Sequence, residues 1–368
     1  MKTSFREISP AEFSEFADAC PVKSYMQSSP MAHRYSTIGR EHYLLGLYHG
    51  DKLVVAGLAS NIYERFGRKI FTFSRGPLTD FSSANLNYLT AFLEEAKKFL
   101  KSRHGIILQI SPSVLVGAVP TDFARILARH GFKYLGEYEQ VKWTYALDFA
   151  SVPGLPPVSL RSHTAKDILA PAIDSTSEQI LSRHFRRDHR YTIKYATSRY
   201  GIKLRILPVS EYATLLALLN ESGREHGFVP RDQKFFEQMS DAFHDDVVAI
   251  VAEYTPEEAA TPIPIAAAFF ILYGDEVIYL SSGLARAYKK LGGPHLIQSA
   301  MLKFAYAHGY RQYNFWGTDT ASDNGVYKFK QGFHGEVEEF VGTFAAPLSP
   351  LGSLYLHKIH PAEHRDLG

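Results

Sequence analysis

The sequence is short of the features that mark secreted and membrane proteins. It contains a single cysteine, Cys20, which cannot form an internal disulfide and so favours a reducing compartment. The first residues, MKTSFREISPAEF, carry no apolar signal-peptide core. No apolar run approaches the ~18–20 residues that span a bilayer, and the longest, residues 265–273, has the length of a buried strand. We therefore expect a cytoplasmic globular protein.

Charge is nearly balanced over the whole chain but not along it. The 40 Lys and Arg residues exceed the 38 Asp and Glu residues by two, which gives a net charge of +2. Residues 183–205 hold eight basic residues and one acidic residue, a local charge of +7, so the rest of the chain carries −5. A basic stripe in a chain that is not basic overall indicates a localised anionic partner rather than DNA.

The length predicts two domains. A chain of 368 residues exceeds one ordinary core, and its clearest linker is the proline- and glycine-rich segment 153–157. Before the linker, hydrophobic periodicity predicts strands and helices in the order 43–48, 53–63, 69–74, helix 85–101, 106–110, helix 122–130 and two final strands. The second half repeats this order. The sequence therefore predicts a mixed, layered α/β (α+β) fold in two copies, the first over residues 1–150 and the second over 151–321.

The basic stripe falls on a predicted helix, residues 177–200. At 100° per residue, its basic side chains cluster within an arc of about 60°. They are Arg183, Arg187, Arg190 and Lys194. Stacked like charges repel one another, and an anionic partner would relieve that repulsion. A purely solvated charged face explains the same pattern.

Residues 308–344 are the second segment in which candidate functional side chains are close together. A short aromatic strand, 310–316, breaks at Gly317 into a polar turn that contains Asp319 and Asp323. Order resumes at residues 327–330, and in a half-buried extended element one of Lys328 and Lys330 points inward among aromatic rings. There, low dielectric strengthens its charge. The alternative is a solvated lysine pair beside a core phenylalanine.

Residues 283–294 form a basic, glycine-bearing loop between a strand and a helix. Arg286, Lys289 and Lys290 precede Gly292 and Gly293, and a helix N-terminus behind such a loop binds anions. A tight turn without a ligand explains the glycines equally well.

Taken in order, several segments resemble the Fem family (FemABX) of peptidoglycan-bridge aminoacyltransferases. The resemblance covers most of the chain, and the order of its motifs is more specific than any one of them. The segments are 27–35, 75–77, 190–196, 227–231, 279–283 and 329–333. The resemblance implies two GNAT-like subdomains with a cleft between them, the first completed by the C-terminal segment from about residue 322 to 368. It also implies the compact type of the family, without the long helical arm that some members carry.

The resemblance also implies the reaction. Such enzymes move an amino acid from aminoacyl-tRNA to the side-chain amine of the third stem-peptide residue of a peptidoglycan precursor, and they use no acetyl-CoA, other cofactor or metal. The acceptor is a UDP-linked or lipid-linked muramyl pentapeptide, and a peripheral contact with the inner membrane face is left open.

By the resemblance, Lys330 next to Phe329 stabilises the tetrahedral intermediate, and Arg190 grips precursor phosphates with Arg34 as a second contact. The motif residues expected to contact substrate are Arg75, Tyr191, Lys194, Tyr279 and Tyr327. Asp319 and Asp323 in the polar turn are candidate bases for deprotonating the amine, and a purely structural role in the turn explains both aspartates as well.

The chain departs from the family pattern at Ser111, where an acidic residue is common before the proline. A carboxylate base at that position is therefore not expected. Two other functions stay open. One is an acyl-CoA-dependent N-acyltransferase of the GNAT class that uses the 283–294 loop. The other is a pseudoenzyme that only binds murein precursor or tRNA.

Overall fold

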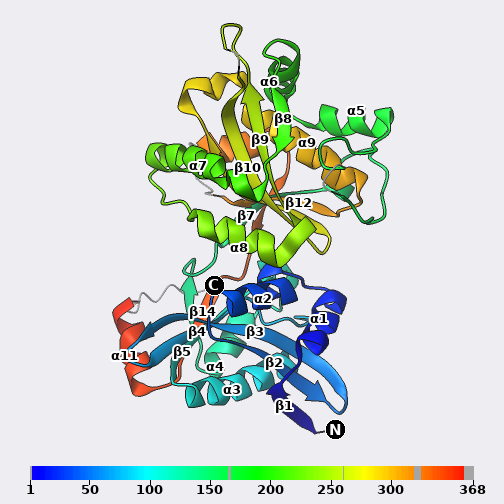
Figure 1. Ribbon diagram of the computed structural model, residues 1–368. Coiled ribbons are helices and arrows are strands. Elements are labelled where there is room, and N and C mark those ends of the chain that lie inside the picture. The colour runs from blue at the N-terminus through cyan, green and yellow to red at the C-terminus, as the bar shows by residue number, and fades with distance from the viewer. Residues whose placement is uncertain (1, 165–166, 260, 319–324, 360–368) are drawn as a thin grey trace. The chain divides into compact units, whose positions relative to one another are not determined.

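The computed structural model describes all residues except 1, 165–166, 260, 319–324 and 360–368. The chain divides into two units, residues 1–142 with 339–368 and residues 143–338 (Figure 1). The sequence predicts boundaries at 150 and about 321, and the two units of the structure meet after residues 142 and 338. The strand β7 (Trp143–Asp148) belongs to the second unit because it pairs with β12 (Gln312–Gly317). The strand β13 (Glu336–Glu339) pairs with the other edge of β7 and so becomes the edge strand of the second unit's sheet.

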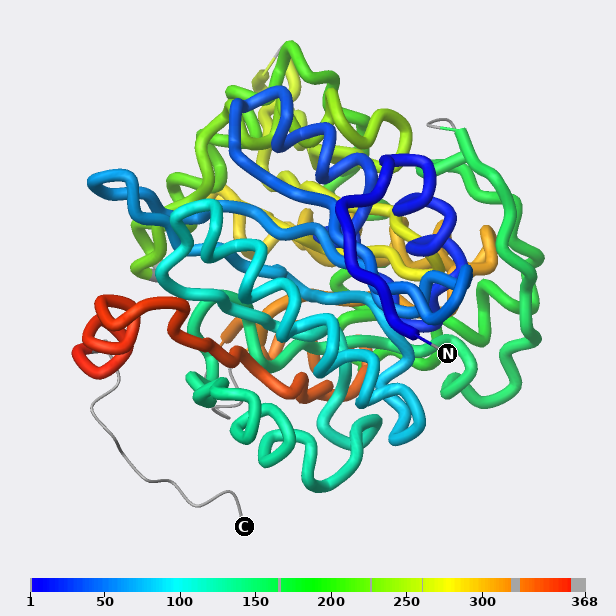
Figure 2. The backbone as a smooth tube through the Cα atoms, turned by 90° about the horizontal axis from the view of Figure 1, so that it is seen from below, coloured from blue at the N-terminus to red at the C-terminus, as the bar shows by residue number. Residues whose placement is uncertain are grey.

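The first unit is a seven-stranded sheet in the order β1-β2-β3-β4-β5-β14-β6. Its strands are β1 (Thr3–Glu7), β2 (His42–His49), β3 (Lys52–Arg65), β4 (Arg68–Arg75), β5 (Gly105–Pro112), β6 (Lys133–Gly136) and β14 (Thr343–Pro347). β4 and β5 are parallel and joined by a helical crossover, whereas the other neighbours are antiparallel. β14 lies between β5 and β6 although it is far from both in sequence, so the C-terminal segment completes this sheet (Figure 2).

The crossover helix α3 (Leu86–Ser102) closes the core of the first unit. The apolar stripe predicted for residues 85–101 is buried, and it packs with Phe71 and Phe73 of β4. The other helices of the unit are α1 (Pro10–Ala19), α2 (Ser29–Thr37), α4 (Phe123–Arg129) and α11 (Pro350–Ile359). The side chain of Gln27, in the connection between α1 and α2, forms hydrogen bonds with two strands of the sheet, β3 and β4. The amide of Gln27, 1% exposed, accepts from Leu58 N at 2.8 Å and donates to the carbonyl oxygens of Leu58 and Ser74 at 3.1 and 2.9 Å.

We expect Gln27→Leu to lower the free energy of unfolding of the first unit by about 3 kcal/mol, because buried backbone groups of Leu58 and Ser74 lose their partners. Urea unfolding measures the change. His33→Ala, an exposed position on α2, is the control and is expected to stay within about 0.5 kcal/mol. A change in Gln27→Leu no larger than in the control would contradict the prediction.

The second unit is also a seven-stranded sheet, in the order β13-β7-β12-β11-β10-β9-β8. The strands not yet given are β8 (Lys203–Ile206), β9 (Val247–Tyr254), β10 (Ile263–Tyr273) and β11 (Glu276–Leu284). As in the first unit, one central pair, β11 and β12, is parallel and joined by a crossover helix, α9 (Gly293–Ala307). Both units thus share one pattern, as the repeated element order predicts.

Helices cover both faces of the second sheet. Alternate residues of β10 face opposite ways: Phe270 joins the core that contains α9, and Phe269 packs against α7 (Tyr212–His226) and α8 (Gln233–Phe243). Within the described residues, no helix combines the length and the apolarity needed to cross a membrane.

The predicted basic helix 177–200 is not continuous. It is two helices, α5 (Ser175–His184) and α6 (Arg187–Ser198), because Phe185 and Arg186 adopt extended backbone angles. Phe185 is 2% exposed and packs on Phe333, so burial of this ring outweighs continuation of the helix. Arg183 is therefore on a different helix from Arg187, and the single basic arc predicted from the sequence is wrong.

Candidate active site

The site opens where the parallel pair of the second unit separates. β11 and β12 pair only from Glu276–Gln312 to Ile278–Asn314. Beyond that point β12 is irregular, and Trp316 has a φ of 63°, a left-handed conformation that is costly for a bulky residue. The N–H of Trp316 donates to the side chain of Asn314 at 2.7 Å, which holds the turn. In the first unit the equivalent strands stay paired as far as Arg75 and Pro112.

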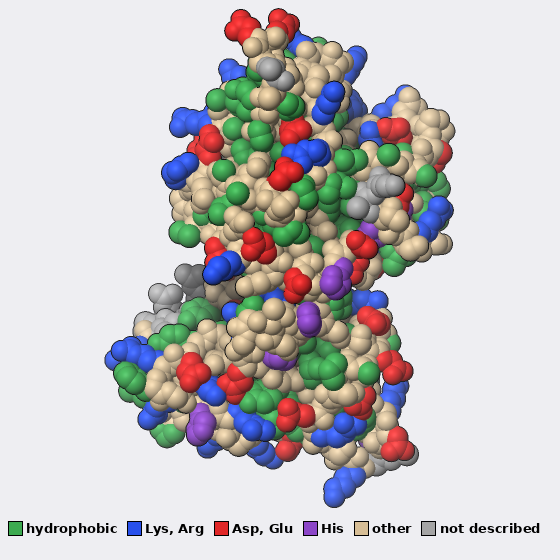
Figure 3. Space-filling model, in the orientation of Figure 1, with side chains coloured by type: hydrophobic (Ala, Val, Ile, Leu, Met, Phe, Trp, Pro, Cys, Tyr) green, Lys and Arg blue, Asp and Glu red, His purple; other side chains and the backbone are tan. Residues whose placement is uncertain are grey.

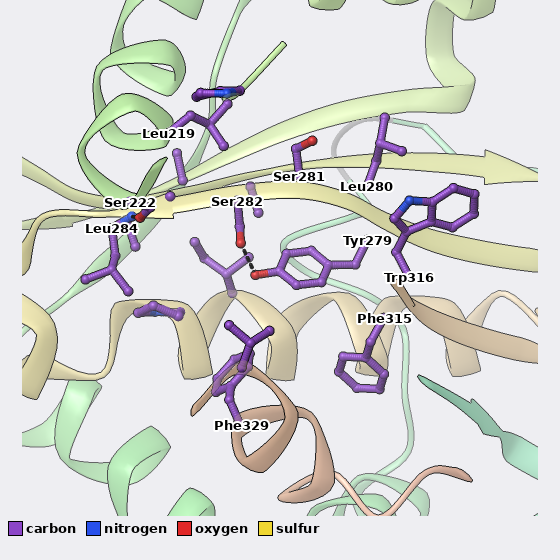
Figure 4. Close-up of a pocket in the computed structure, with 18 of the residues that line it drawn as sticks. Leu219, Ser222, Tyr279, Leu280, Ser281, Ser282, Leu284, Phe315, Trp316 and Phe329 are labelled. Atoms are coloured by element: carbon purple, nitrogen blue, oxygen red, sulfur yellow. Dashed lines mark hydrogen bonds between the residues drawn. The ribbon is translucent and has the colours of Figure 1, made fainter. Parts of the chain in front are cut away.

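A pocket of about 1030 Å³ occupies the opening between β11 and β12. Its wall is formed by α7, β10, β11, the N-terminus of α9, the end of β12 and the helix α10 (Gly325–Gln331). Figure 4 shows the ring of Tyr279 crossing the pocket towards Ser282, with Phe315 and Trp316 from β12 and Phe329 from α10 around it. Apolar and aromatic side chains make up most of the wall, and Glu225, Arg231 and Lys289 are among its charged groups. A mainly apolar lining with some polar groups is usual for a substrate pocket.

Lys330 lines this pocket and is 3% exposed. Its ammonium donates to the carbonyl oxygen of Trp316 at 3.2 Å and to that of Gly317. Burial lowers the pKa of Lys330 from its ordinary value to about 7. An ammonium has three donors, so the two carbonyls leave one for a group in the pocket. The strained end of β12 therefore both opens the pocket and aims the acceptors that hold the lysine.

Lys330 is carried by a helix rather than by the extended element predicted for residues 327–330. Positions two apart on a helix are separated by about 200°, so Lys328 and Lys330 still face opposite ways. Lys328 is exposed and Lys330 is buried. The prediction of one inward lysine is confirmed, although the secondary structure from which it was argued is wrong.

The aromatic neighbours of Lys330 are fixed by packing. Phe329 contacts the rings of His295, His189 and Phe333, with centroids 4.9, 5.8 and 5.5 Å away. Tyr279 donates to Ser282 Oγ, and burial raises the pKa of its phenol to about 12. Tyr327 is half-buried against the ring of Tyr145, 6.1 Å away, and is not among the pocket-lining residues.

The remaining predicted contacts of the second unit are exposed on α6. Arg190 Nη1 donates to the carbonyl of Arg183 at 2.9 Å, and Lys194 projects into solvent. The guanidinium of Arg187 lies 5.4 Å from the ring of Tyr191, which stacks on Tyr195. We call the exposed Arg187, Arg190, Tyr191 and Lys194 the basic face of α6. On the side of the molecule drawn in Figure 3, acidic and basic side chains are interspersed, and no comparable basic surface is seen there.

Arg34 and Arg75 belong to the first unit and are buried, with 8% and 3% of their surface exposed. Arg75 Nη2 donates to the carbonyl of Val141 at 2.8 Å, and its guanidinium lies 4.0 Å from the ring of Phe340. Arg34 lies in α2. The candidate bases Asp319 and Asp323 lie outside the described residues.

Glu139 is a residue that the sequence did not reveal. Its carboxylate accepts from the hydroxyls of Thr72, Ser74 and Ser111 at the carboxyl ends of β4 and β5, at 2.6 Å from Thr72 and 3.2 Å from Ser111. A carboxylate therefore does lie at the strand end that carries Ser111. It is supplied by Glu139 from the connection between β6 and β7, not by position 111 itself. The sequence feature that could have indicated this site is the presence of three hydroxyl residues, Thr72, Ser74 and Ser111, near the ends of two neighbouring strands.

We expect Glu139→Ala to destabilise the first unit by about 1–2 kcal/mol, because the buried hydroxyls of Thr72 and Ser111 lose their acceptor. Thermal unfolding measures it. Glu137→Ala in the same connection is the control, since Glu137 accepts only a 3.3 Å bond from Lys142 N. Equal effects of the two substitutions would show that the hydroxyl cluster does not depend on the carboxylate.

Packing explains Gly292 of the 283–294 loop, and Lys289 of the same loop lines the pocket. Residues Arg286–Leu291 form a 3-10 helix, and Gly292 has a φ of +85°. A Cβ at Gly292 would lie 2.7 Å from Thr192 Cγ2, so α6 closes on this turn and glycine is required there. Across the part of the chain that the structure describes, no cluster of His, Cys, Asp and Glu side chains is arranged as a metal site.

Comparison with known proteins agrees with this geometry. The FemAB family model matches residues 8–260 and 253–358. The chain is 23% identical to aminoacyltransferase FemA of Staphylococcus aureus in an alignment of 424 residues, which covers 94% of this chain and 95% of that protein. That alignment is longer than this chain of 368 residues, so the relative carries insertions that this chain lacks.

Two solved structures share the fold. The crystal structure of FemX has a TM-score of 0.77 at 18% identity and covers 98% of this chain and 100% of its own. A tandem GNAT protein from the clavulanic acid biosynthesis pathway has a TM-score of 0.54 at 12% identity, with 95% and 99% covered. The architecture is thus a duplicated GNAT-like acyltransferase fold. Within that class, the chain belongs to the FemAB family.

Proposed function

We propose that this protein transfers an aminoacyl group from aminoacyl-tRNA to the side-chain amine of the third stem-peptide residue of a peptidoglycan precursor. The reaction class, aminoacyl transfer in the synthesis of interpeptide bridges, follows from the family. The observation that carries the proposal is the buried Lys330 ammonium, held by two backbone carbonyls in the wall of a large, mainly apolar pocket.

The reaction requires the amine and the ester to be held next to each other and a positive charge to lie beside the oxyanion that forms. The amine nitrogen attacks the ester carbonyl and a C–N bond forms. The C–O bond to the ribose then breaks, and the ribose oxygen leaves as a hydroxyl with a proton that came from the amine. A donor aimed at the oxyanion of the tetrahedral intermediate supplies roughly 3–4 kcal/mol in comparable sites. The third N–H of Lys330 is available for this, because Trp316 and Gly317 use the other two. The ester is already activated, and we propose that no cofactor is needed beyond the tRNA itself.

The donor and acceptor are proposed from the shape and charge of the second unit. A pocket of about 1030 Å³ accommodates an aminoacyl ester with its terminal nucleoside. The basic face of α6 suits phosphates, either of the tRNA backbone or of the pyrophosphate of the precursor. Whether the precursor is UDP-linked or lipid-linked decides whether a peripheral membrane contact is needed. We place the reaction in the cytoplasm, where aminoacyl-tRNA is made.

A transfer assay tests the proposal. Total tRNA charged with radiolabelled amino acids is mixed with UDP-muramyl pentapeptide, and label on the peptide is counted with and without ribonuclease. We expect transfer that ribonuclease abolishes. Transfer from acetyl-CoA that resists ribonuclease would instead identify an acyl-CoA-dependent enzyme. Binding of tRNA or precursor with no transfer to either the UDP-linked or the lipid-linked acceptor would identify a non-catalytic binding protein.

A further inference from the structure

The short helix that carries Lys330 is attached to the break between α5 and α6. α10 has seven residues, too few for a helix to be stable without tertiary support. The chain that follows it meets the break directly: the N–H of Arg186 donates to the carbonyl of Gly332 at 2.8 Å, and the rings of Phe185 and Phe333 lie 5.2 Å apart. The interruption of the basic stripe is therefore the docking point for the lysine helix.

His189 contacts the residue next to Lys330. It lies in the first turn of α6 and is 4% exposed. Its Nε2 lies 2.9 Å from the carbonyl oxygen of Phe329, the residue before Lys330, and because a carbonyl only accepts, the nitrogen carries the proton. A Cβ on Gly332 would lie 2.1 Å from the same nitrogen, so the glycine makes room for the imidazole.

His189 points away from the basic face of the same helix. At 100° per residue, its side chain is about 160° from Arg187 and Tyr191, about 140° from Lys194 and about 100° from Arg190. Arg187, Arg190 and Lys194 are exposed, and within the described residues none of them forms an ion pair with a carboxylate, whereas Arg186 pairs with Asp188. A helix moves as a rigid element, so a partner that holds the basic face also fixes the imidazole behind it.

We propose that His189 is a positioning residue that couples the basic face of α6 to Lys330. An RNA backbone held on that face would set, through the hydrogen bond from His189 to Phe329, the placement of the ammonium against the carbonyls of Trp316 and Gly317. The identity of the anion as RNA rests on the proposed function. The coupling itself does not require turnover, and it is tested without turnover.

The experiment measures acetylation of Lys330 by a trace reagent, with mass spectrometry as the readout, in the presence and absence of a blunt-ended RNA duplex. A duplex without a single-stranded end is too wide to enter the pocket, so it does not contact Lys330 itself. The dependence of the effect on His189 separates transmission through α6 from simple covering of the pocket. We expect the duplex to slow acetylation of Lys330 about two- to tenfold in the wild type. His189→Ala should lose this response, whereas His189→Gln, whose amide N–H replaces Nε2–H, should keep it.

Two further variants make the result specific. His189→Leu fills a similar space but has no hydrogen-bond donor, so it should lose the response. It replaces His189→Ala in the experiment if that variant does not fold. Thr197→Ala, an exposed position on α6, should keep it. In the transfer assay, His189→Ala should lower kcat about tenfold with little change in the KM for tRNA. Arg190→Ala, which removes a charge of the basic face, should instead raise the KM for tRNA.

Acetylation of Lys330 that ignores the duplex in the wild type, or that responds equally in His189→Leu, would overturn the coupling. Failure of the proposed function has a different signature. In that case the wild type transfers nothing from aminoacyl-tRNA, yet the duplex still slows labelling of Lys330 in a way that depends on His189.

Discussion

Lys330→Met should sharply reduce aminoacyl transfer and at the same time make the protein more stable at neutral pH. Methionine keeps an unbranched side chain that is one atom shorter, and it removes the charge that faces the oxyanion. We expect kcat to fall by about 10²–10³, the usual cost of losing one oxyanion donor. Lys328→Met is the matched control, because Lys328 is two residues away on the same helix and exposed. It should retain at least half of the activity.

The stability effect follows from burial of the ammonium. In the unfolded chain Lys330 holds its proton up to about pH 10.4, whereas the folded protein releases it near a pKa of about 7. The folded state therefore has a cost that is complete below pH 7 and disappears as the pH rises towards 10. Methionine removes this cost, partly offset because the carbonyls of Trp316 and Gly317 lose a donor.

We expect Lys330→Met to raise the free energy of unfolding by about 1–3 kcal/mol at pH 6–7 and by much less at pH 9–10. Urea unfolding at both pH values measures the difference. A gain that is the same at both would show that the lysine is charged in the folded protein throughout this range. The rates should diverge as well. Turnover that depends on the Lys330 ammonium declines above pH 7, whereas the residual rate of the variant rises as the acceptor amine loses its proton.

Gly283→Ala should be the most damaging glycine substitution near the pocket. Gly283 ends the segment Tyr279–Gly283, and a Cβ on it would lie 2.3–2.4 Å from backbone atoms of Leu218 and Leu219 in α7. Backbone atoms in a packed helix cannot give way as a side chain can. α7 would have to move off β11, and the pocket wall formed by Leu219 and Ser222 would move with it.

We expect Gly283→Ala to lower the free energy of unfolding of the second unit by about 3 kcal/mol or more. Thermal unfolding and soluble yield measure it, and transfer activity should fall in parallel. Gly117→Ala is the control, because a Cβ there meets nothing within 4 Å. Wild-type stability in Gly283→Ala would mean that α7 and β11 are less closely packed than this geometry requires.

The local elements were largely predictable because their signals are local. The apolar stripe of α3 repeats at the helical period, and Gly50 and Asp51 between β2 and β3 form a two-residue hairpin turn, so periodicity and turn chemistry suffice. The order of the motifs was enough to indicate the family and the duplicated fold. The inward lysine was also predictable, since Lys328 and Lys330 face opposite ways in a strand and in a helix alike.

What the sequence by itself determined is therefore the class of fold, most of the order of elements and, through the family resemblance, the identity of the buried cation. The tertiary structure alone decided the break at Phe185, because burial of that ring against Phe333, far away in sequence, outweighs helix continuity. It also brought Glu139 to Ser111 and His189 to Phe329. These contacts join residues 28 and 140 positions apart, and no local period records a hydrogen bond that forms only when distant segments pack together.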